Sequence, residues 1–302
     1  MSGCAGRSCR CWWAACSSPR SRGRCSAATR GEIDVDDRVF VKRGSRHGPD
    51  FFRHEAAGLA WLAAAPGGPR VVRVEEVDDD EITLERIPAG RATTRAALRF
   101  GRSLAAMHDA GAAAWGVPAD GWAGRCFIGN RPQECAPTAS WGEFYAEQRV
   151  RPFVRIAVDL GVLGGADLAV VERACDRVAS GELDDPGDVP ARLHGDLWTG
   201  NVLWTPARAG GEGGGENDVG AVLIDPAAHG GHRETDLAML ALFGAPHPDE
   251  ILRGYDEAHP LREGWRDRVP LHQLHPLATH SAGHGAGYAI ALADAARQVL
   301  RL

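Results

Sequence analysis

The chain has 302 residues, which fits one large domain or two smaller ones with a sizeable core. Its 44% hydrophobic and 25% charged residues are typical of a soluble globular protein. The formal charge of −6 argues against a general nucleic-acid-binding protein, which needs a basic surface. No window reaches the ~18 apolar residues of a membrane span, and no signal peptide is evident. We therefore expect a cytoplasmic protein that binds neither nucleic acid nor membrane.

The first thirty residues differ in composition from the rest. They are rich in Arg, Ser and Ala, and hold five of the eight cysteines: Cys4, Cys9, Cys11, Cys16 and Cys25. These cysteines show neither the spacing of a disulfide framework nor the Cys-x-x-Cys pairs of a zinc site. We expect residues 1–21 to be an atypical segment, either disordered or the product of a wrongly assigned translation start.

The next part of the chain reads as a small mixed lobe, which we place at residues 22–90. A β-rich run at 38–43 is followed by a helical pattern over 49–65 that stops at Pro-Gly-Gly-Pro. Two further strands are predicted at 70–77 and 81–87, joined by three aspartates.

The remainder, residues 91–302, is predicted to be mainly helical. A glycine-rich segment at 207–220 lies between two strand-like runs; a phosphate-binding glycine loop would open into a helix, so we interpret this segment as a flexible hairpin connection. The predicted elements are helices at 93–111, 140–163 and 166–181, short strands within 193–204 and 220–227, helices at 234–244 and 249–259, and a last helix through Tyr288 to Leu302.

The most informative stretch is "LHGDLWTGNVLW" at residues 193–204. It places Asp196 and Asn201 five positions apart, and Asp225 follows after the next strand. Phosphoryl transfer needs a carboxylate that takes the proton of the attacking hydroxyl, together with amide and carboxylate oxygens that bind magnesium. The alternative is that Asp196 and Asn201 are simply turn residues.

The first lobe offers a second feature of the same chemistry. Lys42 ends a predicted strand and Glu55 lies in the following helix. A lysine held by a glutamate in this way contacts nucleotide phosphates, whereas a single lysine beside a strand is usually a solvated charge. The conjunction of Lys42, Glu55, Asp196, Asn201 and Asp225 in this order favours a phosphotransferase.

Five motifs together resemble the fructosamine kinase (ketosamine-3-kinase) family over roughly residues 22–302. They are "FVKR", "FRHEAAGL", "LHGDLWTGN", "LIDPAAHGGHRETDLAML" and the pattern from Gly264 to Leu277. The resemblance implies an α+β, two-lobed protein-kinase-like fold, with an antiparallel sheet in the small N-lobe and a larger, mainly helical C-lobe. It also implies an ATP- and Mg²⁺-dependent kinase that phosphorylates the 3-hydroxyl of ketosamines. The phosphorylated product sheds its sugar, so the activity would repair glycated amines.

The same resemblance assigns roles to individual residues. Asp196 would be the catalytic base, with Asn201 and Asp225 as magnesium ligands. Lys42, held by Glu55, would contact the phosphates. Further candidate ATP contacts are Gly23 in the glycine loop and the adenine-binding hinge formed by Leu84, Glu85, Arg86 and Ile87. Candidate substrate contacts are His194, Trp198 and Arg233, although Arg233 could equally be structural.

The chain departs from the family pattern at the glycine loop. The matching stretch "RGRCSAATR" at 22–30 keeps Gly23 but has arginines where glycines are expected, and bulky side chains hinder the approach of backbone amides to phosphates. Cys25 is there either as a passive small residue or as a redox-sensitive thiol. This departure leaves open a nucleotide-binding but inactive member of the family. A related kinase acting on an aminoglycoside or a choline-like acceptor is the other alternative.

Several other residues have competing interpretations. We expect Asp236 to support the catalytic loop by hydrogen bonding, and Trp141 and Trp265 to lie in the core or a cleft wall. His272, His275, His280 and His284 have helical spacings that suggest either a metal site or a packing face. The partner that we expect is a small-molecule ketosamine or glycated amine, and the protein itself a monomer or homodimer.

Overall fold

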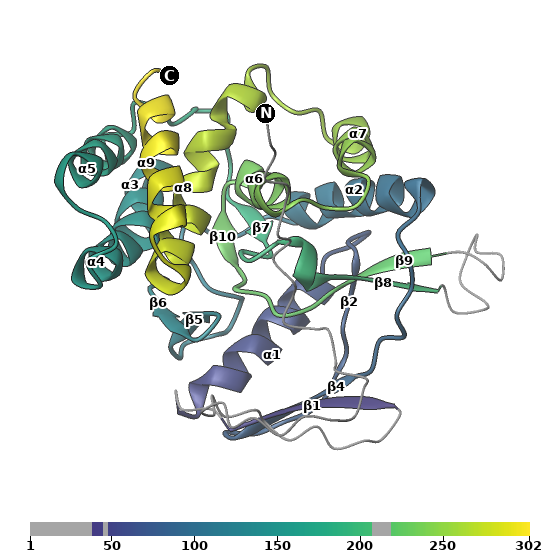
Figure 1. Ribbon diagram of the computed structural model, residues 1–302. Coiled ribbons are helices and arrows are strands. Elements are labelled where there is room, and N and C mark those ends of the chain that lie inside the picture. Colours follow the sequence, from purple (N-terminus) through teal and green to yellow (C-terminus); the bar gives the residue numbers. More distant parts are fainter. Residues whose placement is uncertain (1–37, 45–47, 207–218) are drawn as a thin grey trace, which may run out of the picture.

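The computed structural model describes residues 38–44, 48–206 and 219–302. These residues form two lobes (Figure 1). A small sheet with one long helix occupies one end, and most of the remaining helices gather at the other. The α+β, two-lobed arrangement predicted from the sequence is confirmed. The boundary at residue 90 stays a prediction.

The small lobe contains a three-stranded antiparallel sheet in the order β1 (Val39–Arg43), β4 (Glu81–Glu85) and β3 (Val74–Val77). Helix α1 (Asp50–Ala63) lies against this sheet. Alternate residues of the strands face the helix because side chains in a strand point to opposite faces. The resulting core contains Val41, Ile82, Leu84, Leu59 and Leu62, all buried.

One predicted strand is wrong in detail. The run at 70–77 is split into β2 (Arg70–Val71) and β3, and the two parts join different sheets. Strand β2 pairs in parallel with β9 (Val219–Leu223), which pairs antiparallel with β8 (Val202–Pro206). Strand β2, which precedes the small-lobe strand β3 by three residues, thus belongs to the sheet of the β8–β9 hairpin that follows Asn201.

Two more strand pairs complete the sheets among the described residues. Strand β7 (Ala191–Leu193) pairs antiparallel with β10 (His229–Gly231) and leads into the catalytic motif. A hairpin of β5 (Cys126–Ile128) and β6 (Arg131–Gln133) was not predicted. Each of these strands is only three residues long, too short to show an alternating pattern.

The helical lobe contains more breaks than the sequence pattern predicted. The helix expected at 140–163 contains a π-helical turn, because Pro152 has no N–H to continue the α-helical hydrogen bonds. The helix at 265–284 was indicated only by the spacing of its histidines, because it carries two internal prolines and is buried on several sides. The helices are α2 (Thr94–Asp109), α3 (Trp141–Phe144), the π-turn (Tyr145–Val150), α4 (Arg151–Asp159), α5 (Gly165–Ala179), α6 (Arg233–Phe243), α7 (Pro248–Ala258), α8 (Trp265–His284) and α9 (Ala286–Val299).

Helices α2 and α7 approach unusually closely. A Cβ atom on Gly101 would lie 2.0 Å from the carbonyl oxygen of Ile251, and one on Gly254 would lie 2.0 Å from that of Leu98. Only glycine fits at both positions. This contact fixes α7 against α2, which matters for the site below. Within the described residues, no helix is both long enough and apolar enough to cross a bilayer.

Candidate active site

Residues 194–201, the candidate catalytic loop, form a tight turn directly after β7. Gly195 has a φ of +79°, and a Cβ atom there would lie 2.2 Å from the carbonyl oxygen of Ala227. Any other residue would therefore clash as well as strain the backbone. The amide of Ala227 in turn donates a hydrogen bond to the carbonyl of His194, 3.0 Å away. The glycine thus lets the loop lie against the segment that follows Asp225.

Asp236, at the start of α6, holds this loop from below. Its two carboxylate oxygens accept hydrogen bonds from the backbone amides of His194 and Gly195, at 2.8 and 3.0 Å. The expectation that Asp236 supports the catalytic loop is therefore confirmed. The same carboxylate lies 3.2 Å from Nε2 of His108, whose Nδ1 lies 2.7 Å from the hydroxyl of Tyr255. A fully buried chain of side chains thus anchors the loop to α2 and α7.

Asp196, Asn201 and Asp225 converge as the spacing suggested. Nδ2 of Asn201 donates to the backbone oxygen of Asp196 at 2.8 Å, to its carboxylate at 3.2 Å, and to the backbone oxygen of Asp225 at 3.4 Å. Burial and the nearby charge of Asp225 raise the pKa of Asp196 to about 7, against the lowering effect of the Asn201 hydrogen bond. A carboxylate of this kind has the proton affinity that a general base requires.

Lys42 connects this group to the small lobe. Its Nζ donates to Oε1 of Glu55 on α1 at 2.7 Å and also forms an ion pair with Asp225. Burial alone would lower the pKa of Lys42, but the charges of Glu55 and Asp225 outweigh burial and raise it. The lysine is therefore a fixed positive charge at the point where the two lobes meet.

The residues present suit a magnesium ion. Mg²⁺ prefers oxygen ligands such as carboxylates and amide oxygens. The side chain of Asp225 is 39% exposed, so its carboxylate is open to a cation. Within the described part of the chain, Asn201 makes its side-chain hydrogen bonds through Nδ2, which leaves its Oδ1 available.

The predicted hinge lies where β4 leaves the sheet. Leu84 is buried in the small-lobe core, and the carboxylate of Glu85 accepts hydrogen bonds from the Arg70 side chain and the Arg73 amide. The backbone amides of Glu85 and Arg86 donate to the carbonyls of Arg73 and Arg38. The side chains of Leu84 and Glu85 are thus used within the protein, and Ile87 is half-buried.

His194 and Arg233 do not lie where a substrate would contact them. His194 is fully buried, and its Nε2 is 2.9 Å from the carbonyl oxygen of Ile224. Arg233 forms an ion pair with Asp109 at 2.9 Å and a hydrogen bond with the hydroxyl of Tyr255 at 3.2 Å. The full burial of His194 corrects our assignment of it as a substrate contact, whereas the contacts of Arg233 favour the structural one of its two expected roles.

Trp198 remains a candidate substrate contact and belongs to a group of aromatic rings. It is half-buried in the catalytic loop, and its ring lies edge-on to Phe243 with centroids 6.2 Å apart. Phe243 packs against His280, which stacks on His284 and contacts Tyr288. We call Trp198, Phe243, His280, His284 and Tyr288 the aromatic wall. The sequence predicted Trp198 as a substrate contact but did not predict Phe243 or Tyr288. These two rings come from α6 and α9, and no local sequence pattern indicates that they lie near the loop of Trp198.

Trp141 and Trp265 both pack against neighbouring side chains. Trp141 is buried and stacks on Tyr145, while Trp265 is half-buried with Arg266 over its ring. Gly23 and Cys25 lie outside the described residues.

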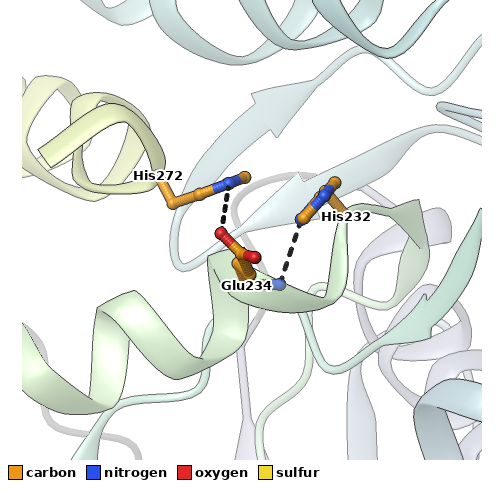
Figure 2. Close-up of side chains that lie close together, drawn as sticks. All are labelled: His232, Glu234 and His272. Atoms are coloured by element: carbon orange, nitrogen blue, oxygen red, sulfur yellow. Dashed lines mark hydrogen bonds and ion pairs between the residues drawn. The ribbon is translucent and has the colours of Figure 1, made fainter. Parts of the chain in front are cut away.

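The histidines of α8 act mainly as packing and hydrogen-bonding groups. Of the four, only His272 belongs to a set of possible metal-ligand atoms within 4.8 Å of one another among the described residues, with His232 and Glu234 (Figure 2). Nδ1 of His232 already accepts from the Glu234 amide, and its Nε2 donates to Asp188. Arg268 binds the Glu234 carboxylate through two nitrogens, at 2.5 and 2.9 Å. This cluster is a hydrogen-bonded tie between α6 and α8 whose atoms are already engaged.

The fold and the site together define a small-molecule phosphotransferase with a protein-kinase-like fold. The shared fold is visible in a solved aminoglycoside phosphotransferase, APH(4)-Ia, which is 17% identical, has a TM-score of 0.55, and aligns over 91% of this chain and 92% of its own.

Closer relatives identify the branch. A crystal structure from Thermobifida fusca, assigned as a fructosamine-3-kinase, is 46% identical with a TM-score of 0.76, over 87% of this chain and 86% of its own. A protein from Synechocystis assigned as a ketoamine kinase is 31% identical over 280 residues, which cover 89% of this chain and 85% of that protein. The family model described as fructosamine kinase matches residues 20–302. The chain belongs to the fructosamine kinase family and is an ATP-dependent phosphotransferase.

Proposed function

We propose that the protein transfers the γ-phosphate of ATP to the 3-hydroxyl of a ketosamine and thereby starts the removal of the sugar from a glycated amine. Family membership supports the substrate class. The observation that carries the chemistry is the position of Asp196, a half-buried carboxylate with a pKa near 7, next to Asn201 and Asp225.

The roles of the reacting groups follow from this geometry. The acceptor hydroxyl attacks the terminal phosphorus, and Asp196 orients it and takes its proton. Lys42, fixed by Glu55, balances negative charge on the phosphates. Positioning and electrostatic stabilisation supply most of the catalysis in phosphoryl transfer, so the protein needs few other reacting groups.

Asp225, Asn201 and residues 84–87 supply the metal and nucleotide contacts in this proposal. Asp225 and Oδ1 of Asn201 would hold Mg²⁺, which when bound offsets charge on the phosphates. The ion pair between Lys42 and Asp225 would then loosen, since the carboxylate gains a second cation. Adenine would bind to backbone groups of residues 84–87 other than the amides of Glu85 and Arg86, which already donate within the protein.

The aromatic wall supplies the acceptor surface in this proposal. Trp198 lies two residues from Asp196, so a sugar stacked on its ring brings a hydroxyl near the base. Aromatic faces also attract cationic amines, which a ketosamine carries next to its sugar. A strongly acidic cleft, which an aminoglycoside would need, is not part of this wall.

A coupled assay of ADP release tests the proposal. The protein is supplied with Mg-ATP and, in separate reactions, a fructosamine, a ribulosamine, choline and an aminoglycoside. ADP release that depends on a ketosamine and is absent from Asp196→Asn supports the proposal. Turnover with choline or the aminoglycoside but with neither ketosamine would contradict the substrate class. No turnover with any acceptor, although ATP still binds in a thermal-shift assay with magnesium, would favour an inactive family member.

A further inference from the structure

A buried positive charge lies next to a cysteine of the β5–β6 hairpin region. Arg149, in the π-helical turn, is 1% exposed. Its guanidinium donates to the backbone oxygens of Glu134 and Gln148 and to Nε2 of His229, and it lies over the ring of Phe144. All of these partners are neutral. Among the described residues, no carboxylate lies within ion-pair distance of this guanidinium.

The remaining partner of Arg149 is a thiol. Its Nη2 lies 3.4 Å from Sγ of Cys135, which follows strand β6. A buried charge is costly unless it is paired, and an ionised Cys135 would supply the missing negative charge. The hydrogen bond from Cys126 and the charge of Arg149 outweigh burial and lower the pKa of Cys135 to about 6.

The second thiol is close to the first and reaches the same opening. Cys126, on strand β5, pairs across the hairpin with Gln133, two residues before Cys135. Both residues line a cavity of about 330 Å³ that Gly124, Arg125, Pro132, Gln133 and Glu134 complete. Cys135 is half-buried at this cavity, so a small reagent can reach it, whereas Cys126 is buried.

We propose that Cys126 and Cys135 form a redox-active dithiol, in which Cys135 is the reactive thiolate and Cys126 the resolving thiol. The ligand class is a small hydroperoxide. The residues that line this cavity include none of those assigned to phosphoryl transfer, and the proposal does not depend on the proposed function.

The reaction balances in two steps. The Cys135 thiolate attacks the terminal oxygen of the hydroperoxide, the O–O bond breaks, and Cys135 sulfenic acid and an alkoxide form; the alkoxide takes up a proton to give the alcohol. The Cys126 sulfur then attacks the Cys135 sulfur, its proton leaves with the hydroxide as water, and the disulfide forms. The two thiols thereby lose two electrons, which reduce the hydroperoxide.

Peptide mapping of the full chain after treatment with hydrogen peroxide tests the pairing. Trypsin together with a glutamyl endopeptidase cuts after Arg125, Glu134 and Glu143, so the two cysteines fall on separate peptides, 126–134 and 135–143. We expect these two peptides to be recovered as one linked species that dithiothreitol separates. Their recovery without a link, or a link from Cys135 to any other cysteine, would overturn the proposal.

Reactivity of single thiols gives a second, independent readout. Cys175 is the matched control, because it is a buried thiol whose pKa is raised by burial to about 12. At pH 7 we expect iodoacetamide to modify Cys135 at least ~100-fold faster than Cys175, since only the thiolate reacts. Cys126→Ser should leave a Cys135 sulfenic acid that dimedone captures, and Cys135→Ser should abolish capture. Equal rates at Cys135 and Cys175, or no capture in Cys126→Ser, would contradict the assignment.

Discussion

The two halves of the active site are held in different ways. On the small-lobe side, Lys42 is held by two carboxylates, and its side chain is still 24% exposed. On the helical side, the loop that carries Asp196 is held by Asp236, which is 1% exposed and belongs to a buried chain of hydrogen bonds.

This difference allows one side of the site to exchange partners and holds the other side in one geometry. An ion pair that solvent reaches can exchange partners, as the proposed function requires of Lys42 when a nucleotide and a metal ion bind. A buried hydrogen-bonded chain has no water to replace a lost partner, so it fixes one geometry. We therefore expect changes near Lys42 to alter ATP use with little effect on folding, and changes in the buried chain to alter stability first.

The largest expected effect is that of Asp196→Asn. Removal of the base should lower kcat by about 10³-fold, within the range of general-base catalysis. The fold should be unharmed or slightly more stable, because the raised pKa shows that the charged form is disfavoured where it lies. Steady-state kinetics and thermal unfolding at pH 8 measure both. A variant that retains more than a tenth of the activity would refute the assignment.

Lys42→Met should have the next largest effect. It removes the cation between Glu55 and Asp225, and we expect kcat/KM for ATP to fall by about 10²-fold. The melting temperature should change little. Arg53→Met on the same helix is a matched control, because Arg53 pairs with Asp79 at the exposed surface. Equal losses of kcat/KM in the two variants would contradict a phosphate-binding role for Lys42.

Acid should weaken the helical lobe through its buried histidines. Burial, then the charge of His232, lowers the pKa of His272 to about 4; burial, then the charge of Arg149, lowers that of His275 to about 3. Histidine in the unfolded chain has a pKa near 6.5, so below that pH the unfolded chain binds more protons than the folded protein does. The contribution of these histidines to the unfolding free energy is therefore fully present above pH 6.5 and is lost as the pH falls toward 4. Each histidine contributes a slope of up to about 1.4 kcal/mol per pH unit. Urea unfolding between pH 7 and 5 measures the slope, which His275→Gln should reduce; an unchanged slope would contradict this account.

The smallest expected effect is that of Tyr255→Phe. The hydroxyl contacts His108 and Arg233, so its loss should cost about 1 kcal/mol of unfolding free energy and lower kcat a few-fold through the loop. Tyr145→Phe is the control: its hydroxyl is also buried, but contacts the backbone of α8. Tyr145→Phe should lower the unfolding free energy by a similar amount and leave kcat unchanged. Equal kcat values for Tyr255→Phe and Tyr145→Phe would show that the hydrogen bonds from Tyr255 through His108 to Asp236 do not affect the loop that carries Asp196.

The sequence predicted local features of the site well. The spacing of Asp196, Asn201 and Asp225, and the order of Lys42 and Glu55, correspond to contacts that the structure shows. Each of these residues lies in or within three residues of a strand, or in a helix with a clear periodic pattern, so local rules place it.

Long-range partners could not be predicted in the same way. Tyr255 meets His108 only because two glycines let α2 and α7 touch, and no local pattern reports that contact. His194 was expected to contact the substrate, yet its ring is fully buried and lies against the carbonyl oxygen of Ile224. The Cys126–Cys135 pair depends on a hairpin too short to recognise and on an arginine that follows fourteen residues later.

The most direct measurement is the identification of the phosphorylated carbon. Wild-type protein and Asp196→Asn are each incubated with Mg-ATP and a fructosamine, and the product is analysed by phosphorus and carbon NMR. The account predicts one phosphate ester at C3 with the wild type, followed by release of the free amine, and formation of that ester about 10³-fold more slowly with Asp196→Asn. An ester at another carbon, or equal product from both proteins, would contradict it.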